Sequence, residues 1–155
     1  MILYHGSNME IDVIDLNRSK PNKDFGRAFY LSADESQAQE MAQAKCIQFG
    51  GTPCVTRFEV DDVQMSKLCY KRFEEYARDW AQFVYDNRDE TKEFTHPYDI
   101  VFGPIADDYI GLQMRRFRFS KLTFNQFLEE IKYPKGITFQ YAFCTQKAIN
   151  LLKRI

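Results

Sequence analysis

Histidine is scarce in this chain, and its cysteines lack the spacing of a metal site. Among 155 residues there are two histidines and four cysteines, and no two cysteines form the close pairs used by zinc-binding sequences. We therefore expect no metal site, and reduced thiols of the kind found in cytoplasmic proteins. The chain also lacks an apolar run long enough to span a bilayer, and its start lacks a secretion signal. These absences predict a cytoplasmic protein with no membrane partner.

An excess of charge of one sign is missing too. The 21 lysines and arginines nearly balance the 22 aspartates and glutamates, for a formal net charge of −1. Such a chain has no overall field to attract a polyanion, so nucleic acid is not an indicated partner. The one basic cluster, Arg115–Lys121, is predicted to be a solvated helix end and connector rather than a phosphate-binding patch.

Glycine-rich nucleotide motifs are absent, which excludes a Rossmann dinucleotide site and a P-loop. What the chain does have is 45% hydrophobic and 15% aromatic residues, enough for an ordinary globular core. Its length predicts a single domain over residues 1–155.

Strand and helix patterns are mixed without a regular βαβ alternation. This favours an α+β fold around a mixed or antiparallel sheet over a doubly wound one. Apolar alternation predicts strands over residues 2–4, 28–32, 53–60, 98–102 and 137–144. Helical spacing and capping residues predict helices over 34–49, 73–87, 107–117, 123–131 and from 145 through 152.

Three strand-borne polar groups stand far apart in the sequence. His5 lies where the first strand breaks at Gly6, Tyr30 follows a second glycine turn, and Gln140 interrupts the last strand. A glycine beside a histidine lets backbone amides approach a ligand. We expect the three to form one site. For each, a packing role is the alternative, and His96 is predicted to be exposed.

Four blocks in this order carry a resemblance to a known family. They are Tyr4–Ser7, Asp24–Ser32, Tyr98–Asp108, and the strand bearing Gln140 and Phe143. Together they resemble an uncharacterised bacterial family of the ADP-ribosyltransferase-like superfamily. The likeness runs from end to end and is to the diphtheria-toxin-like branch, whose motif is histidine, tyrosine, glutamate. It implies a split, NAD-binding β-sheet core with flanking helices.

The resemblance also implies roles for single residues. His5 would bond the adenosine ribose hydroxyl, and the Gly6 backbone would hold the nicotinamide carboxamide. Tyr30 would stack on the nicotinamide ring, and Gln140 would grip the nicotinamide-ribose hydroxyl where the family has glutamate. Tyr30 and Gln140 form the expected catalytic pair. The expected NAD-binding set comprises His5, Gly6, Ser7, Asp24, Gly26, Arg27, Phe29 and Tyr30.

By this likeness the chain is an NAD-dependent mono-ADP-ribosyltransferase, a bacterial toxin or effector that acts on a macromolecule and has an antitoxin partner. Gln140 carries no charge to stabilise a cationic transition state, and losing one such contact typically costs about 2.7–4 kcal/mol. The alternatives are a non-catalytic module that binds NAD, a nucleotide or a partner, and an interaction protein with an aromatic surface.

Two further residues, Asp24 and Cys144, could also have a role in the site. Asp24 is expected either to cap its own turn or to orient Arg27. A hydrolase built from Cys144 and His5 finds no support in the local sequence, because Cys144 sits at a strand end like a structural residue.

Overall fold

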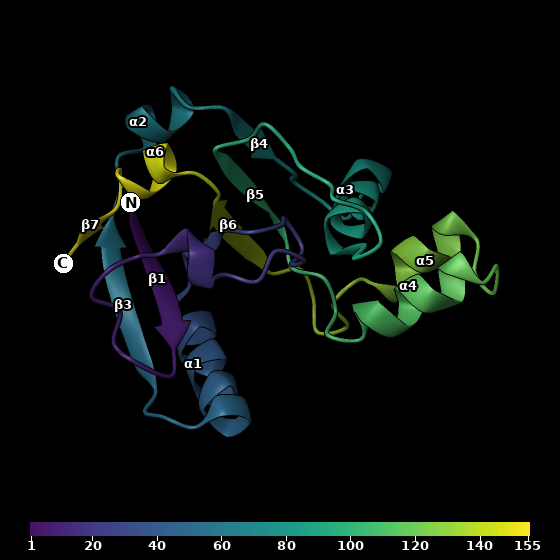
Figure 1. Cartoon of the computed structure of the whole chain (residues 1–155), viewed down its shortest axis with the longest axis horizontal. Coiled ribbons are helices and arrows are strands. Elements are labelled where there is room, and N and C mark those ends of the chain that lie inside the picture. The colour runs from purple at the N-terminus through teal and green to yellow at the C-terminus, as the bar shows by residue number, and fades with distance from the viewer.

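The computed structural model describes the whole chain, residues 1–155, as two β-sheets and six α-helices (Figure 1). The three-stranded sheet has the order β1-β3-β7 and is antiparallel, and it consists of β1 (Ile2–Ser7), β3 (Cys54–Glu59) and β7 (Lys153–Arg154). The four-stranded sheet has the order β2-β6-β5-β4, with β2 (Phe29–Leu31), β6 (Phe139–Phe143), β5 (Ile100–Pro104) and β4 (Tyr70–Arg72). Because β4 and β5 run parallel and the other pairs antiparallel, the predicted α+β class with a mixed sheet is confirmed.

The two sheets meet at a single bridge between Tyr4 and Ser32. The amide of each residue donates to the carbonyl of the other, at 2.8 and 2.9 Å. One apolar core lies between the sheets, and it contains Leu3, Leu31, Phe58, Ile100, Phe102, Tyr141 and Phe143. Successive side chains of a strand point to opposite faces. Tyr30, Gln140 and Ala142 therefore lie on the other face of the four-stranded sheet.

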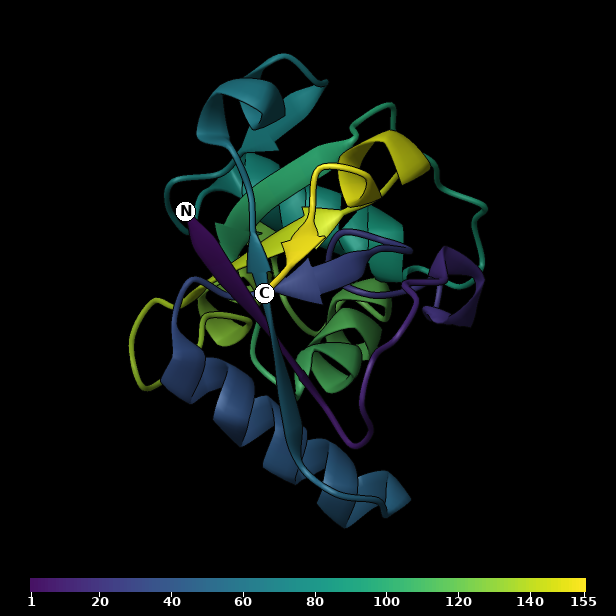
Figure 2. The same cartoon turned by 90° about the vertical axis from the view of Figure 1, so that its left-hand side faces the viewer.

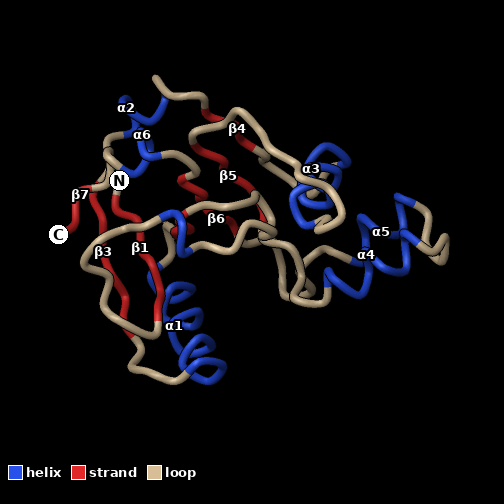
Figure 3. The backbone as a smooth tube through the Cα atoms, in the orientation of Figure 1, coloured by secondary structure: helices blue, strands red, loops and turns tan.

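That other face is covered by helices. A second core packs Val101 and Ala142 against α3 (Arg78–Arg88), α4 (Ile110–Arg118) and α5 (Phe124–Glu130). Helix α1 (Glu35–Phe49) lies instead beside β1 and β3 (Figures 1 and 2). Between β1 and β2 the chain is a long loop with one short 3-10 helix, η1 (Leu16–Arg18), as Figure 3 shows.

The first strand does not break at Gly6, because β1 continues to Ser7. Three predicted helices are wrong in extent. Helix α4 begins at Ile110 rather than 107, after an N-cap residue whose side chain makes no capping hydrogen bond. The last one, α6 (Gln146–Ile149), ends early because the chain turns at Leu151 and pairs with the edge of β3 as β7. Helix α3 begins at Arg78 rather than 73. Phe73 directly follows β4, and its amide donates to the carbonyl of Phe102 in β5, which keeps this residue in an extended conformation. Strand β4 and helix α2 (Asp62–Ser66) were not predicted at all. None of the helices is both long and apolar enough to cross a membrane.

Candidate functional site

A cavity of about 450 Å³ lies beside the bridge that joins the two sheets. Its walls come from β1, β2, α1 and the loop over residues 11–24, and Arg88, residues 105–108 and Gln140 complete it. The volume is in the range of small-molecule sites. Segments far apart in the sequence therefore line one space.

The structure brings most of the predicted site residues to this cavity. Those that line it are His5, Gly6, Asp24, Phe29, Tyr30 and Gln140. Ser7, Gly26 and Arg27 do not line it. Arg27 is exposed, and its guanidinium group donates to three carbonyls of the loop over residues 11–24, those of Leu16, Asn17 and Ser19. Arg27 thus holds the loop that forms one wall.

The imidazole of His5 is neutral and oriented by two contacts. Its Nδ1 lies 2.7 Å from the Tyr30 carbonyl, and since a carbonyl only accepts, Nδ1 carries the proton. The ring stacks on Phe29 at 4.2 Å between centroids. Burial, and the positive charges of Lys45 and Lys23, lower its pKa to about 3. Nε2 is therefore an unprotonated hydrogen-bond acceptor at neutral pH.

The shifted pKa of His5 predicts a pH dependence of stability. Between about pH 3 and the ordinary pKa of 6.5, His5 is protonated in the unfolded chain and unprotonated in the folded chain. Stability is therefore lost as pH falls through this window, by up to about 1.4 kcal/mol per pH unit from this group. Urea unfolding at several pH values in this window gives the free energy of unfolding as a function of pH. That free energy should change less with pH in His5→Gln than in wild type. Equal slopes of the two would contradict the lowered pKa of His5.

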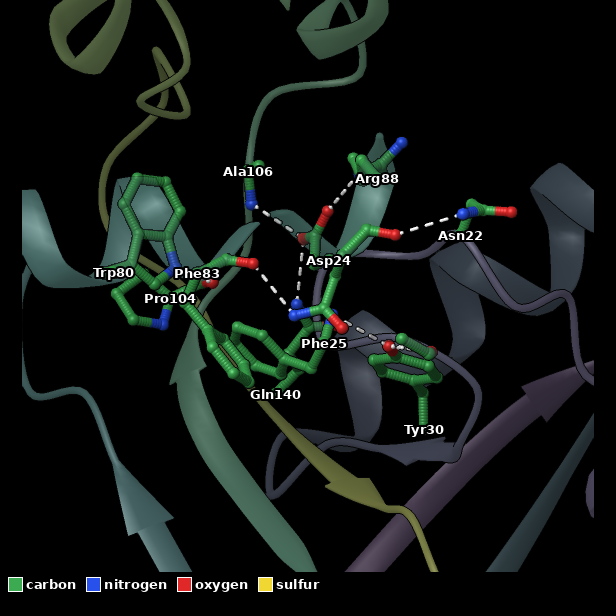
Figure 4. A network of polar contacts seen from close by, with 12 residues as sticks. Asn22, Asp24, Phe25, Tyr30, Trp80, Phe83, Arg88, Pro104, Ala106 and Gln140 are labelled. Atoms are coloured by element: carbon green, nitrogen blue, oxygen red, sulfur yellow. Dashed lines mark hydrogen bonds and ion pairs between the residues drawn. The ribbon is translucent and has the colours of Figure 1, made fainter. Parts of the chain in front are cut away.

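The hydroxyl of Tyr30 is occupied by the protein itself. It donates to the Gly26 carbonyl at 2.7 Å and accepts from the Phe25 amide at 3.0 Å (Figure 4). Burial and the nearby Asp24 carboxylate raise its pKa well above the usual value. This hydroxyl is not an acid–base group, so the ring alone is available to a ligand. The Lys23 ammonium lies over that ring, 5.1 Å from its centroid.

The buried carboxylate of Asp24 joins three segments of the chain. It accepts from Arg88 Nε at 2.7 Å, from the Ala106 amide at 3.1 Å and from Gln140 Nε2 at 3.0 Å (Figure 4). Both expected roles of Asp24 are wrong, because its side chain neither caps its own turn nor contacts Arg27. Its three donors come instead from α3, from the segment after β5 and from β6.

The contact with Asp24 sets the orientation of Gln140. Its Nε2 points to the carboxylate, so Oε1 is directed elsewhere and makes no hydrogen bond within the protein. No fully buried side-chain oxygen or nitrogen lacks a partner, so Oε1 is at least partly accessible. A glutamate here would face Asp24 with two carboxylates in contact, which disfavours the ionised pair. The amide is thus the group that fits beside Asp24.

Four cationic residues line the cavity that the sequence did not indicate, namely Arg18, Lys23, Lys45 and Arg88. Lys45 donates to the Gly6 carbonyl at 2.8 Å, and burial together with the charge of Lys23 lowers its pKa to about 8. One signal was present in the sequence. Gln37, Met41 and Lys45 are spaced by four and so share a helix face, and all three line the cavity.

The second histidine corrects another expectation. His96 is half-buried rather than exposed: its Nε2 lies 2.9 Å from the Phe25 carbonyl, and its Nδ1 accepts from the Tyr98 amide at 3.2 Å. It therefore fixes the turn that precedes β2. Cys144 is not part of the cavity, and burial raises its pKa to about 12. A thiol with that pKa is no nucleophile at neutral pH.

Residues 1–154 match the model of a family described as "Protein of unknown function (DUF3990)". The chain belongs to this family. No curated protein and no solved structure matches it.

The groups that line the cavity indicate what kind of ligand it can bind. Two acceptors, His5 Nε2 and Gln140 Oε1, are free for hydroxyl donors, and the ring of Tyr30 offers an aromatic surface. No cluster of three or more histidine, cysteine, aspartate or glutamate side chains is placed to hold a metal ion. The arrangement suits an organic ligand that carries hydroxyl groups and a planar ring.

Proposed function

We propose that this protein binds NAD in the cavity and transfers its ADP-ribose unit to a macromolecule. One observation carries the proposal: His5, Tyr30 and Gln140, borne by three strands, line the same cavity. The resemblance of the four sequence blocks to the ADP-ribosyltransferase-like superfamily assigns these three residues to NAD. In this proposal the two sheets form the split, NAD-binding core of that superfamily. The protein would act as a toxin or effector and would have an antitoxin partner.

Each group has a task in the proposed complex. His5 Nε2 accepts from a hydroxyl of the adenosine ribose, and the nicotinamide ring stacks on Tyr30. Gln140 Oε1 accepts from a hydroxyl of the nicotinamide ribose. The bond from that ribose to the ring nitrogen breaks, nicotinamide leaves as a neutral molecule, and an oxocarbenium-like centre forms. A nucleophile of the acceptor attacks this centre and loses its proton to solvent.

Asp24 would supply negative charge near the reacting ribose indirectly, through the amide of Gln140. Its carboxylate accepts from Gln140 Nε2 and so polarises the amide, which makes Oε1 a stronger acceptor. Arg88 takes part of that charge through its own contact with Asp24. Stabilisation of the cationic transition state is therefore weaker than a glutamate would give, and slow transfer is expected.

The proposal is tested by mixing the purified protein with NAD and measuring binding by calorimetry and released nicotinamide by chromatography. Labelled NAD in a cell lysate reports transfer to a macromolecule. Gln140→Ala should lower turnover about 10²-fold, the usual loss for one preorganised electrostatic contact. The control is Gln39→Ala, which removes an exposed glutamine of α1 outside the cavity and should leave turnover unchanged.

The uncharged Gln140 favours one second candidate, a module that binds NAD or a nucleotide without catalysis. NAD binding that is lost in His5→Ala, with no nicotinamide released by wild type, would select this candidate. Absence of NAD binding to the wild-type protein would overturn both. Growth arrest on expression, relieved by the product of a neighbouring gene, would support the toxin role.

A further inference from the structure

Two ammonium groups in the cavity wall are in no ion pair. Of the four cationic residues that line the cavity, Arg88 pairs with Asp24 and Arg18 lies near Asp15. Lys23 and Lys45 form no ion pair at all. Cationic side chains that are half-buried are usually paired, because desolvation disfavours the charged form.

The charge of Lys23 acts on Lys45, and both lysines act on His5. Burial is the first cause that lowers the pKa of each lysine. The charge of Lys23 lowers the pKa of Lys45 further, whereas the charges of Lys20 and Arg88 lower that of Lys23 and Asp24 raises it. The charges of Lys23 and Lys45 both lower the pKa of His5. The lysines stand on separate elements, the loop before β2 and helix α1, and converge on one cavity. The cavity wall therefore carries two positive charges that repel each other.

We propose that Lys23 and Lys45 form a subsite for a diphosphate group, the part of a dinucleotide that lies between its two nucleosides. This inference rests on the proposed function for the identity of the ligand, and it adds the residues that hold its charge. A diphosphate supplies an ion-pair partner for both lysines at once.

The contacts of the two lysines within the protein leave donors free for such an anion. Lys45 uses one of its three N–H groups on the Gly6 carbonyl. Lys23 makes no hydrogen bond and rests over the Tyr30 ring, where the proposed function places the nicotinamide. A ring stacked on Tyr30 would displace this ammonium group, and a diphosphate within reach would receive it.

Inorganic pyrophosphate is the simplest probe of this subsite. Binding to wild type, Lys23→Gln and Lys45→Gln is measured by calorimetry, and each substitution should weaken it by about tenfold or more, since each removes charge-assisted hydrogen bonds. The control is Lys135→Gln, which removes an exposed lysine that lies outside the cavity and makes no ion pair. It should leave the affinity unchanged.

A pH series gives a second reading. The other charged or titratable groups that line the cavity include His5, Asp15, Arg18, Asp24, Arg88 and Asp108. Free Lys45 loses its proton near pH 8, and a bound anion raises its pKa, so its contribution to binding declines above that pH. The ratio of affinities of wild type and Lys45→Gln should therefore shrink between about pH 7 and about pH 9.5. The ionisation of pyrophosphate cancels in this ratio.

The outcomes separate this inference from the proposed function. If wild type binds NAD and releases nicotinamide, but both lysine variants bind pyrophosphate and NAD as wild type does, the subsite is wrong and the proposed function stands. If pyrophosphate binds in a lysine-dependent way but NAD does not bind, the subsite stands and the proposed function fails. If wild type binds neither, both are overturned.

Discussion

Replacing Gly6 by alanine is expected to destabilise the protein by about 3 kcal/mol or more, at the upper end of what overpacking costs. A Cβ at this position would lie 1.9 Å from the carbonyl oxygen of Ala38 and 2.9 Å from the amide nitrogen of Ala42. Both are backbone atoms of α1, so the whole helix has to move away from β1. Urea or thermal unfolding of Gly6→Ala measures the loss.

Gly111→Ala is the matched control for this prediction. Gly111 lies in α4, where an added Cβ would meet no atom within 4 Å and the backbone is not left-handed. Alanine should therefore stabilise the helix by about 0.5–1 kcal/mol. The two glycine substitutions thus have opposite expected signs. A stability of Gly6→Ala equal to that of wild type would show that α1 can move away from β1 at no cost.

Asp24→Ala is the second substitution with a large expected effect, a loss of about 2–4 kcal/mol of stability. The buried amide of Ala106 and the carboxamide of Gln140 lose their acceptor. Arg88 loses its partner as well, although its side chain is 32% exposed and regains part of its hydration. Denaturant unfolding measures the total, and Asp108→Ala provides the control.

Asp108 is a suitable control because its side chain is exposed and makes no hydrogen bond or ion pair, although it also lines the cavity. Its replacement should change stability by less than about 0.5 kcal/mol. If Asp24→Ala unfolds at the same denaturant concentration as Asp108→Ala, the Asp24 network does not contribute to stability. That result would also remove the structural reason for an amide at position 140.

Gly6 and Asp24 both have a structural role beside the ligand role that the resemblance suggests. The closeness of α1 to β1 requires Gly6, and this contact also brings Lys45 to the cavity. The Asp24 carboxylate accepts from Gln140 Nε2, so an amide fits at position 140 better than a second carboxylate would.

Local patterns in the sequence were sufficient for most of the elements. Alternation in β6 placed Tyr141 and Phe143 on one face and Gln140 on the other. Asp34 and Thr123 begin α1 and α5 by accepting from the amides of the first turn, as their side chains predict. Strand β7 and helix α6 were misjudged because pairing with the edge of β3 outweighs the apolar spacing of the last residues.

The sequence by itself determined the α+β class, the strands that carry Tyr30 and Gln140, and the cap of α1 at Asp34. These depend on periodicity and on contacts over a few residues. Only the tertiary structure decided the partners of Asp24, the orientation of Gln140 and the convergence of two unpaired lysines on one cavity. Asp24 and Gln140 are 116 residues apart, and no local preference links them. Their contact exists because the order of strands and the packing of helices bring distant segments to one place.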